Sequence, residues 1–261
     1  MNKIIIFVAV ALLVIAFAGI GYASSLGPVE PLGPMKVGVG VEYNGIYSRD
    51  LDISQSEGVA DDEVKLSNQG YVELAMGITD WCNAYARLGT ANMKEKINWD
   101  FGRNQTINYN NGLLWGIGSN ALYNMGNNFG IGGDIQFNMW FTDGSSVSGS
   151  NSPTFTQKGS LSVTDFQTAI YLTYTYEPPG TTSKIIPYIG GYYSRFNIHW
   201  RKSTIYTDGT YIYTSEGNTR SKDDFGALVG INIPVSENFS YKLEGRFIAE
   251  NAMSIGAKYK F

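Results

Sequence analysis

Apolar residues recur at every second position through most of residues 36–261. The clearest stretch is 130–141, in which Ile135, Phe137 and Met139 alternate with polar residues. A period of two is the pattern of a β-strand that has one apolar and one polar face. The sequence therefore predicts an all-β fold of about ten strands, within a range of roughly eight to twelve. The alternating segments are 36–47, 70–78, 83–91, 113–123, 130–141, 165–176, 185–200, 225–235, 241–248 and 252–261.

The second face of these strands distinguishes a membrane barrel from a soluble β-sandwich. It is rich in Gly, Asn, Gln, Thr and Tyr, and charged residues make up only 16% of the chain, against about 25% in an ordinary soluble domain. A soluble sandwich buries its apolar faces and presents polar, charged faces to water. In lipid the apolar face points outward, and the strands have to close on themselves because every backbone group must be paired. We therefore expect a transmembrane antiparallel up-and-down β-barrel.

The connections between the segments alternate in length. The short turns are 79–82, 124–128, 178–184 and 236–239, the long polar stretches are 48–67, 92–110, 142–164 and 201–223, and only the connection 249–251 departs from this rule. Outer-membrane barrels have short periplasmic turns and long extracellular loops. The last long stretch contains Asp208-Gly209 between the strand-like segments 203–206 and 210–215. It is predicted as a hairpin that extends the strands above the membrane.

The first residues have the pattern of an export signal. Lys3 gives a positive start before the uncharged apolar run 4–20, and Gly21 and Ala23 place small residues before a cleavage point after Ala23. We predict a cleaved signal peptide (1–23), a periplasmic N-terminal lead (24–35) and a barrel domain (36–261). A retained membrane helix is the alternative, because about 17 residues are just enough to span a bilayer.

Aromatic residues gather near the predicted strand ends, where the interfacial girdles of a barrel lie. The alternative interpretation is that they form the core of a soluble sandwich. The residues are Tyr43, Tyr47, Trp81, Trp99, Trp115, Trp140, Phe141, Tyr176, Trp200 and Tyr259.

The last eight residues, 254–261, combine a polar Ser254, a spaced Gly256 and the alternating aromatics Tyr259 and Phe261. This pattern resembles the C-terminal assembly signal of bacterial outer-membrane β-barrel proteins, and the chain is similar in architecture to small barrels of the OmpA or OmpW kind. The resemblance implies insertion by the barrel-assembly machinery, contact with outer-membrane lipid and lipopolysaccharide, and localisation in a bacterial outer membrane. We expect a monomer.

Charged residues on the inward face of the predicted strands form a polar lumen network. Glu73 and Arg87 lie at equal distances on either side of Asp80, so they are expected to face each other across one turn. Glu244 and Lys258 are placed in the same way about Asn251 and form a second predicted pair. The nine predicted lumen charges are Glu42, Glu73, Arg87, Asp134, Arg195, Lys242, Glu244, Arg246 and Lys258.

Two functions of this lumen remain open. A barrel of about eight strands is just filled by its side chains, so a barrel of about ten strands with paired charges is expected to hold a polar plug. A plugged barrel has a structural or surface-interaction role. The alternative is a narrow channel for ions or small solutes that is gated by the charge pairs.

The chain is not expected to be an enzyme. Omptin proteases, which are ten-stranded outer-membrane barrels and a more distant alternative, use an Asp-x-His element that faces an acidic pair. The corresponding place here reads Asn197-Ile198-His199, so the carboxylate that orients the histidine is missing. Ser194 is predicted to have the wrong parity for an inward nucleophile beside His199. Asp61-Asp62 is interpreted as a solvated pair in a loop.

Composition argues against other classes of partner and cofactor. Lys and Arg total 19 against 23 Asp and Glu, which does not fit a nucleic-acid-binding protein. One cysteine and one histidine do not fit an all-protein zinc site. No metal or cofactor is therefore expected.

Overall fold

Eleven β-strands make up the regular structure of the described chain. The computed structural model describes residues 26–27, 30–52, 59–99, 103–150, 155–180, 184–207 and 210–261. The predicted signal peptide, 1–23, and its cleavage point lie outside these residues, which contain no helix long and apolar enough to cross a membrane. The strands are β1 (Val37–Asp50), β2 (Val59–Gly77), β3 (Cys82–Trp99), β4 (Arg103–Gly126), β5 (Phe129–Ser150), β6 (Phe155–Tyr174), β7 (Ile186–Thr207), β8 (Thr210–Arg220), β9 (Phe225–Pro234), β10 (Phe239–Phe247) and β11 (Asn251–Lys260).

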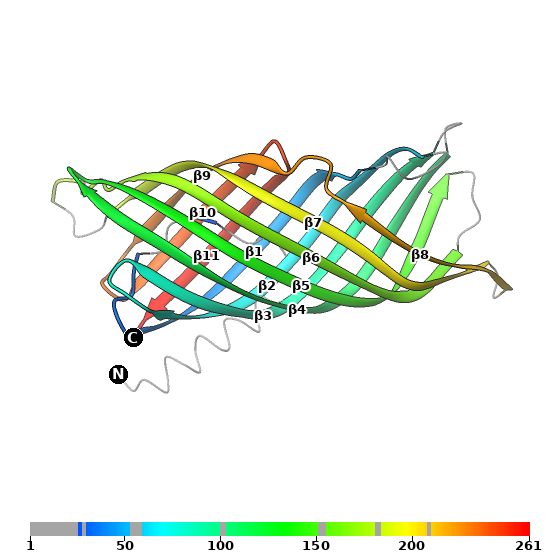
Figure 1. Ribbon diagram of the computed structural model, residues 1–261, viewed down its shortest axis with the longest axis horizontal. Coiled ribbons are helices and arrows are strands. Elements are labelled where there is room, and N and C mark those ends of the chain that lie inside the picture. Colours follow the sequence, from blue (N-terminus) through cyan, green and yellow to red (C-terminus); the bar gives the residue numbers. More distant parts are fainter. Residues whose placement is uncertain are drawn as a thin grey trace.

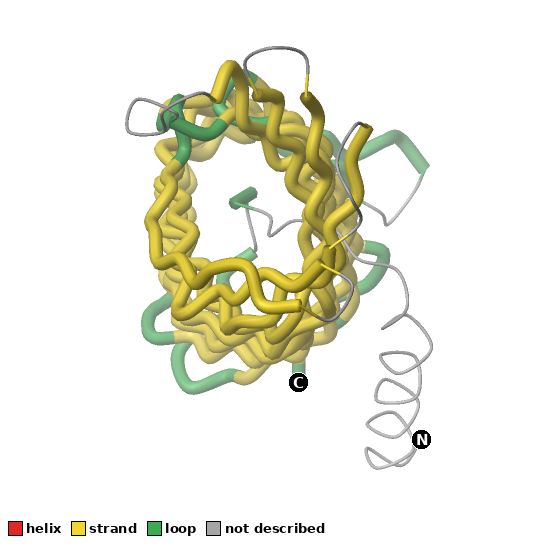
Figure 2. Tube along the Cα trace, turned by 90° about the vertical axis from the view of Figure 1, so that its right-hand side faces the viewer, coloured by secondary structure: helices red, strands yellow, loops and turns green. Residues whose placement is uncertain are grey.

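Ten of these strands form a closed ring. Strands β1 to β7 pair in sequence order, and β7, β9, β10, β11 and β1 complete the circuit. All pairs are antiparallel, and β8 is attached to β7. Figure 2 shows the strands encircling the lumen, and Figure 1 shows them from the side. The predicted closed antiparallel barrel of about ten strands is confirmed.

The wall of the ring has two heights. Strands β9, β10 and β11 have 10, 9 and 10 residues, whereas β4, β5 and β7 have 24, 22 and 22. The additional length of the long strands, together with β8, forms what we call the outer extension, toward the right-hand end of Figure 1. It comprises residues 49–52, 59–66, 93–99, 103–110, 142–150, 155–163, 196–207 and 210–222.

Most of the stretches predicted as long polar loops are strands of the outer extension. The hairpin predicted between β7 and β8 is present, because Thr207 pairs with Thr210. The stretches 48–67, 92–110 and 142–164 also contain paired strands, with Glu95 opposite Ile107 as one example. Polar residues occupy both faces in much of these stretches, so the apolar alternation that reveals a strand is interrupted there.

At the level of the outer extension, the wall of the barrel is closed without β9, β10 and β11, which are too short to reach it. The end of β1 meets the segment after β8, where Leu51 and Ser221 form a β-bridge. The Asp52 amide donates to the Arg220 carbonyl at 2.8 Å, and the Lys222 amide donates to the Asp50 carbonyl at 3.0 Å. At this level the wall therefore passes from β7 through β8 to β1.

A belt of large apolar side chains surrounds the ring on its outer surface. All ten ring strands contribute to it, and the exposed fractions reach 56% at Leu74, 61% at Leu88 and 63% at Ile189. Where the structure describes the outward side chains of the outer extension, they are polar instead, as at Lys65 and Lys94. The apolar belt thus ends where the outer extension begins.

Strand β7 faces the opposite way from the prediction. Tyr188, Tyr192 and Phe196 are between 0% and 3% exposed and point into the lumen, whereas Ile189 and Arg195 point outward. The prediction was wrong because β7 carries apolar residues on both faces, so a period of two cannot tell which face meets lipid.

Trp140 is not part of an interfacial girdle. It is fully buried inside the outer half of the barrel, with its ring centroid 5.6 Å from that of Phe196. Other predicted girdle residues are exposed on the outer surface, including Tyr47, Trp81 and Trp115. The side chains of Trp99 and Trp200 lie outside the described residues.

Candidate functional site

The inner half of the lumen contains a network of buried ion pairs, which we call the inner cluster: Glu42, Glu73, Arg87, Lys242 and Lys258. Glu73 and Arg87 are directly opposite in the β2–β3 ladder, and Arg87 Nη2 lies 2.9 Å from Glu73 Oε2. Lys258 Nζ reaches the other oxygen of Glu73 at 3.0 Å. The predicted Glu73–Arg87 contact is therefore present, and β11 supplies a second cation to the same carboxylate.

Aromatic rings hold the Arg87 guanidinium in place. Its Cζ lies 4.8 Å from the centre of the Tyr71 ring and 4.3 Å from that of Tyr85. Tyr85 donates to Asp134 at 2.8 Å, and Tyr71 donates to Glu42 at 2.5 Å. Arg87 is thus stacked between two rings whose hydroxyls are bound to carboxylates.

Replacing Arg87 with alanine is expected to lower the temperature at which the folded barrel opens. The substitution leaves Glu73 buried with Lys258 as its remaining cationic partner in the described chain, and breaking a buried pair costs about 3 kcal/mol or more. The opening temperature can be read from the heat-dependent gel shift of the refolded protein. Lys184→Ala is the control, because the Lys184–Glu177 pair is exposed; equal opening temperatures for both variants would contradict the prediction.

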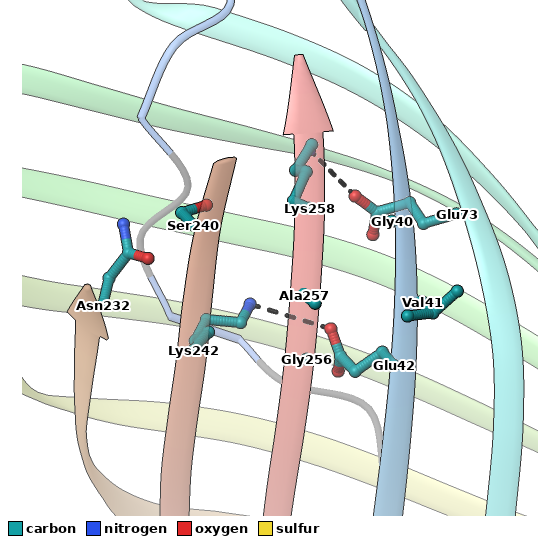
Figure 3. A pocket seen from close by; sticks show the side chains of 10 residues that line it. All are labelled: Gly40, Val41, Glu42, Glu73, Asn232, Ser240, Lys242, Gly256, Ala257 and Lys258. Carbon is teal, nitrogen blue, oxygen red and sulfur yellow. Dashed lines mark hydrogen bonds and ion pairs between the residues drawn. The ribbon is translucent and has the colours of Figure 1, made fainter. Parts of the chain in front are cut away.

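A small cavity of about 30 Å³ lies beside the inner cluster. Its wall includes the carboxylates of Glu42 and Glu73 and the ammonium groups of Lys242 and Lys258, which Figure 3 shows pairing across it. Gly40 and Gly256 also line it, and a Cβ at Gly256 would lie 3.3 Å from Glu42 Cγ. A space of this size accommodates about one water molecule.

A second buried network, the outer cluster, lies farther along the lumen: Arg49, Asp165, Ser194, Arg246 and Glu250. Arg49 Nη2 lies 2.6 Å from Glu250 Oε2, and Arg246 Nη1 lies 3.2 Å from Glu250 Oε1. Arg49 also donates to Ser194 Oγ at 2.7 Å, and Ser194 donates to Asp165 at 3.1 Å. Because these residues come from β1, β6, β7, β10 and the β10–β11 turn, the cluster joins opposite walls of the barrel.

The structure places eight of the nine predicted lumen charges on the inward face. Arg195 is the exception, since it is exposed on the outer surface opposite Phe166, as a consequence of the reversed β7. Arg49, Asp165 and Glu250 are buried lumen charges that the prediction missed. Arg49 and Glu250 lie in stretches predicted to be connections, for which no inward or outward face was assigned. Asp165 lies two residues before the inward Gln167 on the same strand, and this spacing could have identified it as inward.

Glu244 and Lys258 do not form the predicted pair. Glu244 lies opposite Ser254, and Lys258 lies opposite Ser240, because the β10–β11 turn is centred before Asn251. Lys258 binds Glu73 instead. Glu244 accepts hydrogen bonds from the Tyr188 hydroxyl at 3.0 Å and from the Leu26 amide at 2.9 Å.

Apolar side chains are buried inside the outer extension and the adjoining part of the ring. Trp140, Val163, Phe196 and Ile198 are fully buried there and form a continuous core. The remaining members of the core are Leu51, Val64, Tyr71, Ala91, Met93, Ile107, Tyr109, Leu114 and Leu161. These buried side chains occupy part of the lumen at the level of the core.

Two carboxyl groups are buried in this part of the outer extension. Glu95 is fully buried and accepts a hydrogen bond from Tyr109 at 2.6 Å, and Asp62 is 7% exposed beside it. Burial raises the pKa of Asp62 to about 6, and burial together with the Asp62 carboxylate raises the pKa of Glu95. Asp62 is thus not the solvated loop residue that the sequence predicted.

Within the predicted N-terminal lead, 24–35, two apolar side chains of the described residues are buried against the inner wall of the barrel. Among its described residues, Leu26 is fully buried against Tyr188, Tyr171 and Leu228 in the lumen. Leu32 is 5% exposed and packs with Ala75 and Tyr85. Figure 2 shows loop segments inside the ring of strands. Apolar side chains in the lead explain this position, because they escape water by entering the barrel.

His199 has no carboxylate partner among its described contacts. Its Nδ1 is hydrogen-bonded to Asn218 Oδ1, and it lies on the outward face of β7. Ser194 was predicted to point outward and His199 inward. Because β7 is reversed, Ser194 points into the lumen and His199 points outward, so the two side chains still lie on opposite faces of the strand. Within the described ranges, no three or more Cys, His, Asp and Glu residues are grouped so as to hold a metal ion.

The residues of the predicted assembly signal lie on β11 and at its end. Ser254 is 2% exposed and faces the lumen, and Gly256 lines the small cavity. The Tyr259 and Phe261 rings contact each other edge to face, with centroids 5.0 Å apart, and Phe261 is 45% exposed. The alternation of polar and aromatic residues therefore places the aromatic rings toward the membrane-facing surface.

The inside and outside of this ring have opposite polarity to those of a soluble β-fold. Buried ion pairs of the inner and outer clusters lie in the lumen, while the apolar belt faces outward on all ten strands. An exposed apolar belt on a closed ring is stable in lipid. The chain is a transmembrane β-barrel. Barrels of this antiparallel architecture are those of outer membranes, in agreement with the predicted localisation.

Comparison with known proteins gives structural similarities alone. No protein-family model and no curated protein matches the chain. The translocator domain of the autotransporter NalP from Neisseria meningitidis is 10% identical over 88% of this chain and 90% of its own, with a TM-score of 0.47. The outer membrane protease OmpT from Escherichia coli is 12% identical over 91% of this chain and 99% of its own, with a TM-score of 0.48. Similarity at this level says nothing about activity.

Proposed function

We propose that the chain is a non-enzymatic barrel of the bacterial outer membrane whose filled lumen has a structural role. The supporting observation is that the lumen is occupied at successive levels by the lead and inner cluster, the outer cluster, and the apolar core. Arg49, Arg246, Glu250 and Trp140 are each no more than 2% exposed. Such a filling makes the wall rigid, because buried ion pairs and packed rings connect strands that are not neighbours.

The rigid barrel supports a surface-interaction role for the outer extension. Its strands continue past the apolar belt, and the described apolar side chains in its interior are packed, so the extension presents a fixed surface to water outside the membrane. Those of its outward side chains that the structure describes, such as Lys65 and Lys94, are polar. Insertion by the barrel-assembly machinery, contact with lipopolysaccharide and a monomeric state are further parts of this proposal.

The refolded protein is expected to be silent in a planar lipid bilayer. The buried apolar core lies in the lumen on the way to the outer extension, and hydrophobic constrictions prevent conduction by excluding water. Conductance is measured after the heat-dependent gel shift has verified folding. Stable open steps from the native chain would overturn the proposal of a filled lumen.

A narrow channel for ions or small solutes is the second candidate function. The cavity beside the inner cluster supports it, because charged side chains and two glycines line a space that holds about one water. The bilayer experiment separates the two functions. An omptin-like protease, the third alternative, gains no support from His199, whose described partner is Asn218.

A further inference from the structure

The described residues of the lead, Leu26, Gly27 and 30–35, occupy a site that the barrel provides for them. Leu26 is fully buried among Ala169, Tyr171, Tyr188, Tyr192, Leu228 and Ala249. A Cβ at Gly27 would overlap the ring of Tyr188. Tyr188 cannot easily move aside, because it is 3% exposed and its hydroxyl donates to Glu244. The site therefore accepts an apolar side chain followed by glycine.

The barrel binds the backbone of the lead as well as its side chains. The Leu26 amide donates to both oxygens of Glu244, at 2.9 and 3.2 Å. The Leu32 amide donates to Asn83 Oδ1 at 2.9 Å. Glu244 is 1% exposed and Asn83 is also 1% exposed, so both acceptors are buried polar groups aimed at the lead. Hydrogen bonds to a carboxylate are stronger than those between neutral groups.

The mouth of the site is marked by one ion pair. Lys260 Nζ, at the end of β11, lies 2.7 Å from Glu30 Oε2. The side chain of Glu30 is 32% exposed there, whereas Leu26 farther inside is fully buried. The lead thus passes from the exposed mouth to the buried level of Glu244.

The closure of the barrel does not depend on the lead. The β1–β11 seam begins at the Gly38–Lys260 pair, and the described lead residues before Val37 belong to none of the eleven strands. The Met35 amide of the lead donates to the Gly77 carbonyl at the end of β2 at 2.9 Å, but no described residue of the lead belongs to a ladder of the ring.

We propose that the inner lumen is a peptide-binding site of which the chain's own lead is the resident ligand. The site takes a peptide with an apolar residue before glycine, it binds the peptide amides through Glu244 and Asn83, and it opens at the mouth beside Lys260. This inference goes beyond the proposed structural role, because it assigns the inner lumen a ligand that can be exchanged.

The first test uses the full chain and asks whether the lead is enclosed. Cysteine is introduced at Leu26 or at Met35 in a Cys82→Ser background, and labelling by a membrane-impermeant maleimide is followed in the folded barrel. Met35 is 79% exposed and Leu26 is fully buried, so Leu26→Cys is expected to react at least about tenfold more slowly. Equal rates in the folded barrel would overturn the proposal.

The second test measures binding of a peptide supplied from outside. The probe is a fluorescent synthetic peptide with the sequence of residues 24–35, added to full chains in detergent. The native chain is expected to bind little of it, because a tethered ligand has an effective concentration in the millimolar range. Gly27→Ala weakens the tethered lead through Tyr188 and is expected to increase peptide binding at least about tenfold.

Matched variants make the second test decisive. Gly191→Ala is the control, since a Cβ at that exposed position has its nearest neighbour at 3.7 Å, and it is expected to behave like the native chain. Adding Glu244→Gln to Gly27→Ala is expected to lower peptide binding several-fold in molecules that pass the gel-shift assay for folding. Equal peptide binding by Gly27→Ala and Gly191→Ala would refute the peptide-binding site. The proposal of a filled lumen is tested separately, by the conductance measurement in a planar bilayer.

Discussion

Replacing Arg49 with alanine is expected to produce one of the largest losses of stability of any single substitution in this barrel. Arg49 is 1% exposed and contacts Glu250 at 2.6 Å and Asp165 at 3.7 Å. Its guanidinium also lies 4.9 Å from the centre of the Phe196 ring. Removing Arg49 takes a positive charge away from two buried carboxylates, those of Glu250 and Asp165. A single broken pair of this kind costs about 3–5 kcal/mol.

The measurement is the denaturant midpoint of the barrel in lipid vesicles, followed by tryptophan fluorescence. Arg220→Ala is the matched control, because the Arg220–Asp52 pair is at the surface, with the Arg220 side chain 55% exposed, and surface pairs are worth about 0–1 kcal/mol. Arg49→Ala combined with Glu250→Gln is expected to recover part of the loss, since it removes one stranded charge. A midpoint for Arg49→Ala that matches the control would show that the outer cluster does not stabilise the barrel.

The second large effect is a loss of stability of the outer extension as the pH rises from 5 to 8. Burial raises the pKa of Asp62 to about 6 and also raises that of Glu95. A carboxyl whose pKa is higher in the folded state favours folding while it is protonated and loses that contribution as the pH passes through the folded-state value. The loss for this pair is on the order of 2 kcal/mol.

Glu95→Gln is expected to abolish most of this pH dependence and to stabilise the extension at pH 8. Glutamine has nearly the same shape, and its amide oxygen can still accept from Tyr109, while the charge is gone. Hydrogen exchange of residues 59–66 and 93–99, corrected for intrinsic rates, reports the local stability. Glu177→Gln is the control, because the Glu177 side chain is 62% exposed and Glu177 is not part of the Asp62–Glu95 pair. If the hydrogen-exchange protection of Glu95→Gln still falls with rising pH as it does in the native chain, the pH dependence does not come from the Asp62–Glu95 pair.

The membrane-spanning ring could be predicted from the sequence because lipid imposes one simple rule on each strand. Leu74, Leu88 and Ile170 lie on the outward face at the predicted parity, with Glu73 and Arg87 inward. The rule failed in β7, where Tyr188, Tyr192 and Phe196 line the lumen and make both faces apolar. It also could not detect the strands of the outer extension, where water surrounds the wall and selects no apolar outer face.

The sequence predicts contacts in the candidate site only where the two residues lie on neighbouring strands joined by a short turn. Glu73 and Arg87 meet because a short turn joins their strands. Arg49 and Glu250 come from the ends of β1 and the β10–β11 turn, and their contact depends on ring closure between the two ends of the chain. The burial of Leu26 likewise requires the completed lumen, so no local pattern in the lead could indicate it.

The seam of the ring has a consequence for the order of folding. Val41 pairs with Ala257, so the last ladder joins the first strand to the final one. Contacts between distant parts of a chain form slowly, because the loop between them must first be ordered. Until that ladder forms, β1 and β11 are free edges of a curved sheet, and such edges can recruit a strand from another molecule. Completion of the final strand is thus the step that separates a closed barrel from an aggregation-prone intermediate.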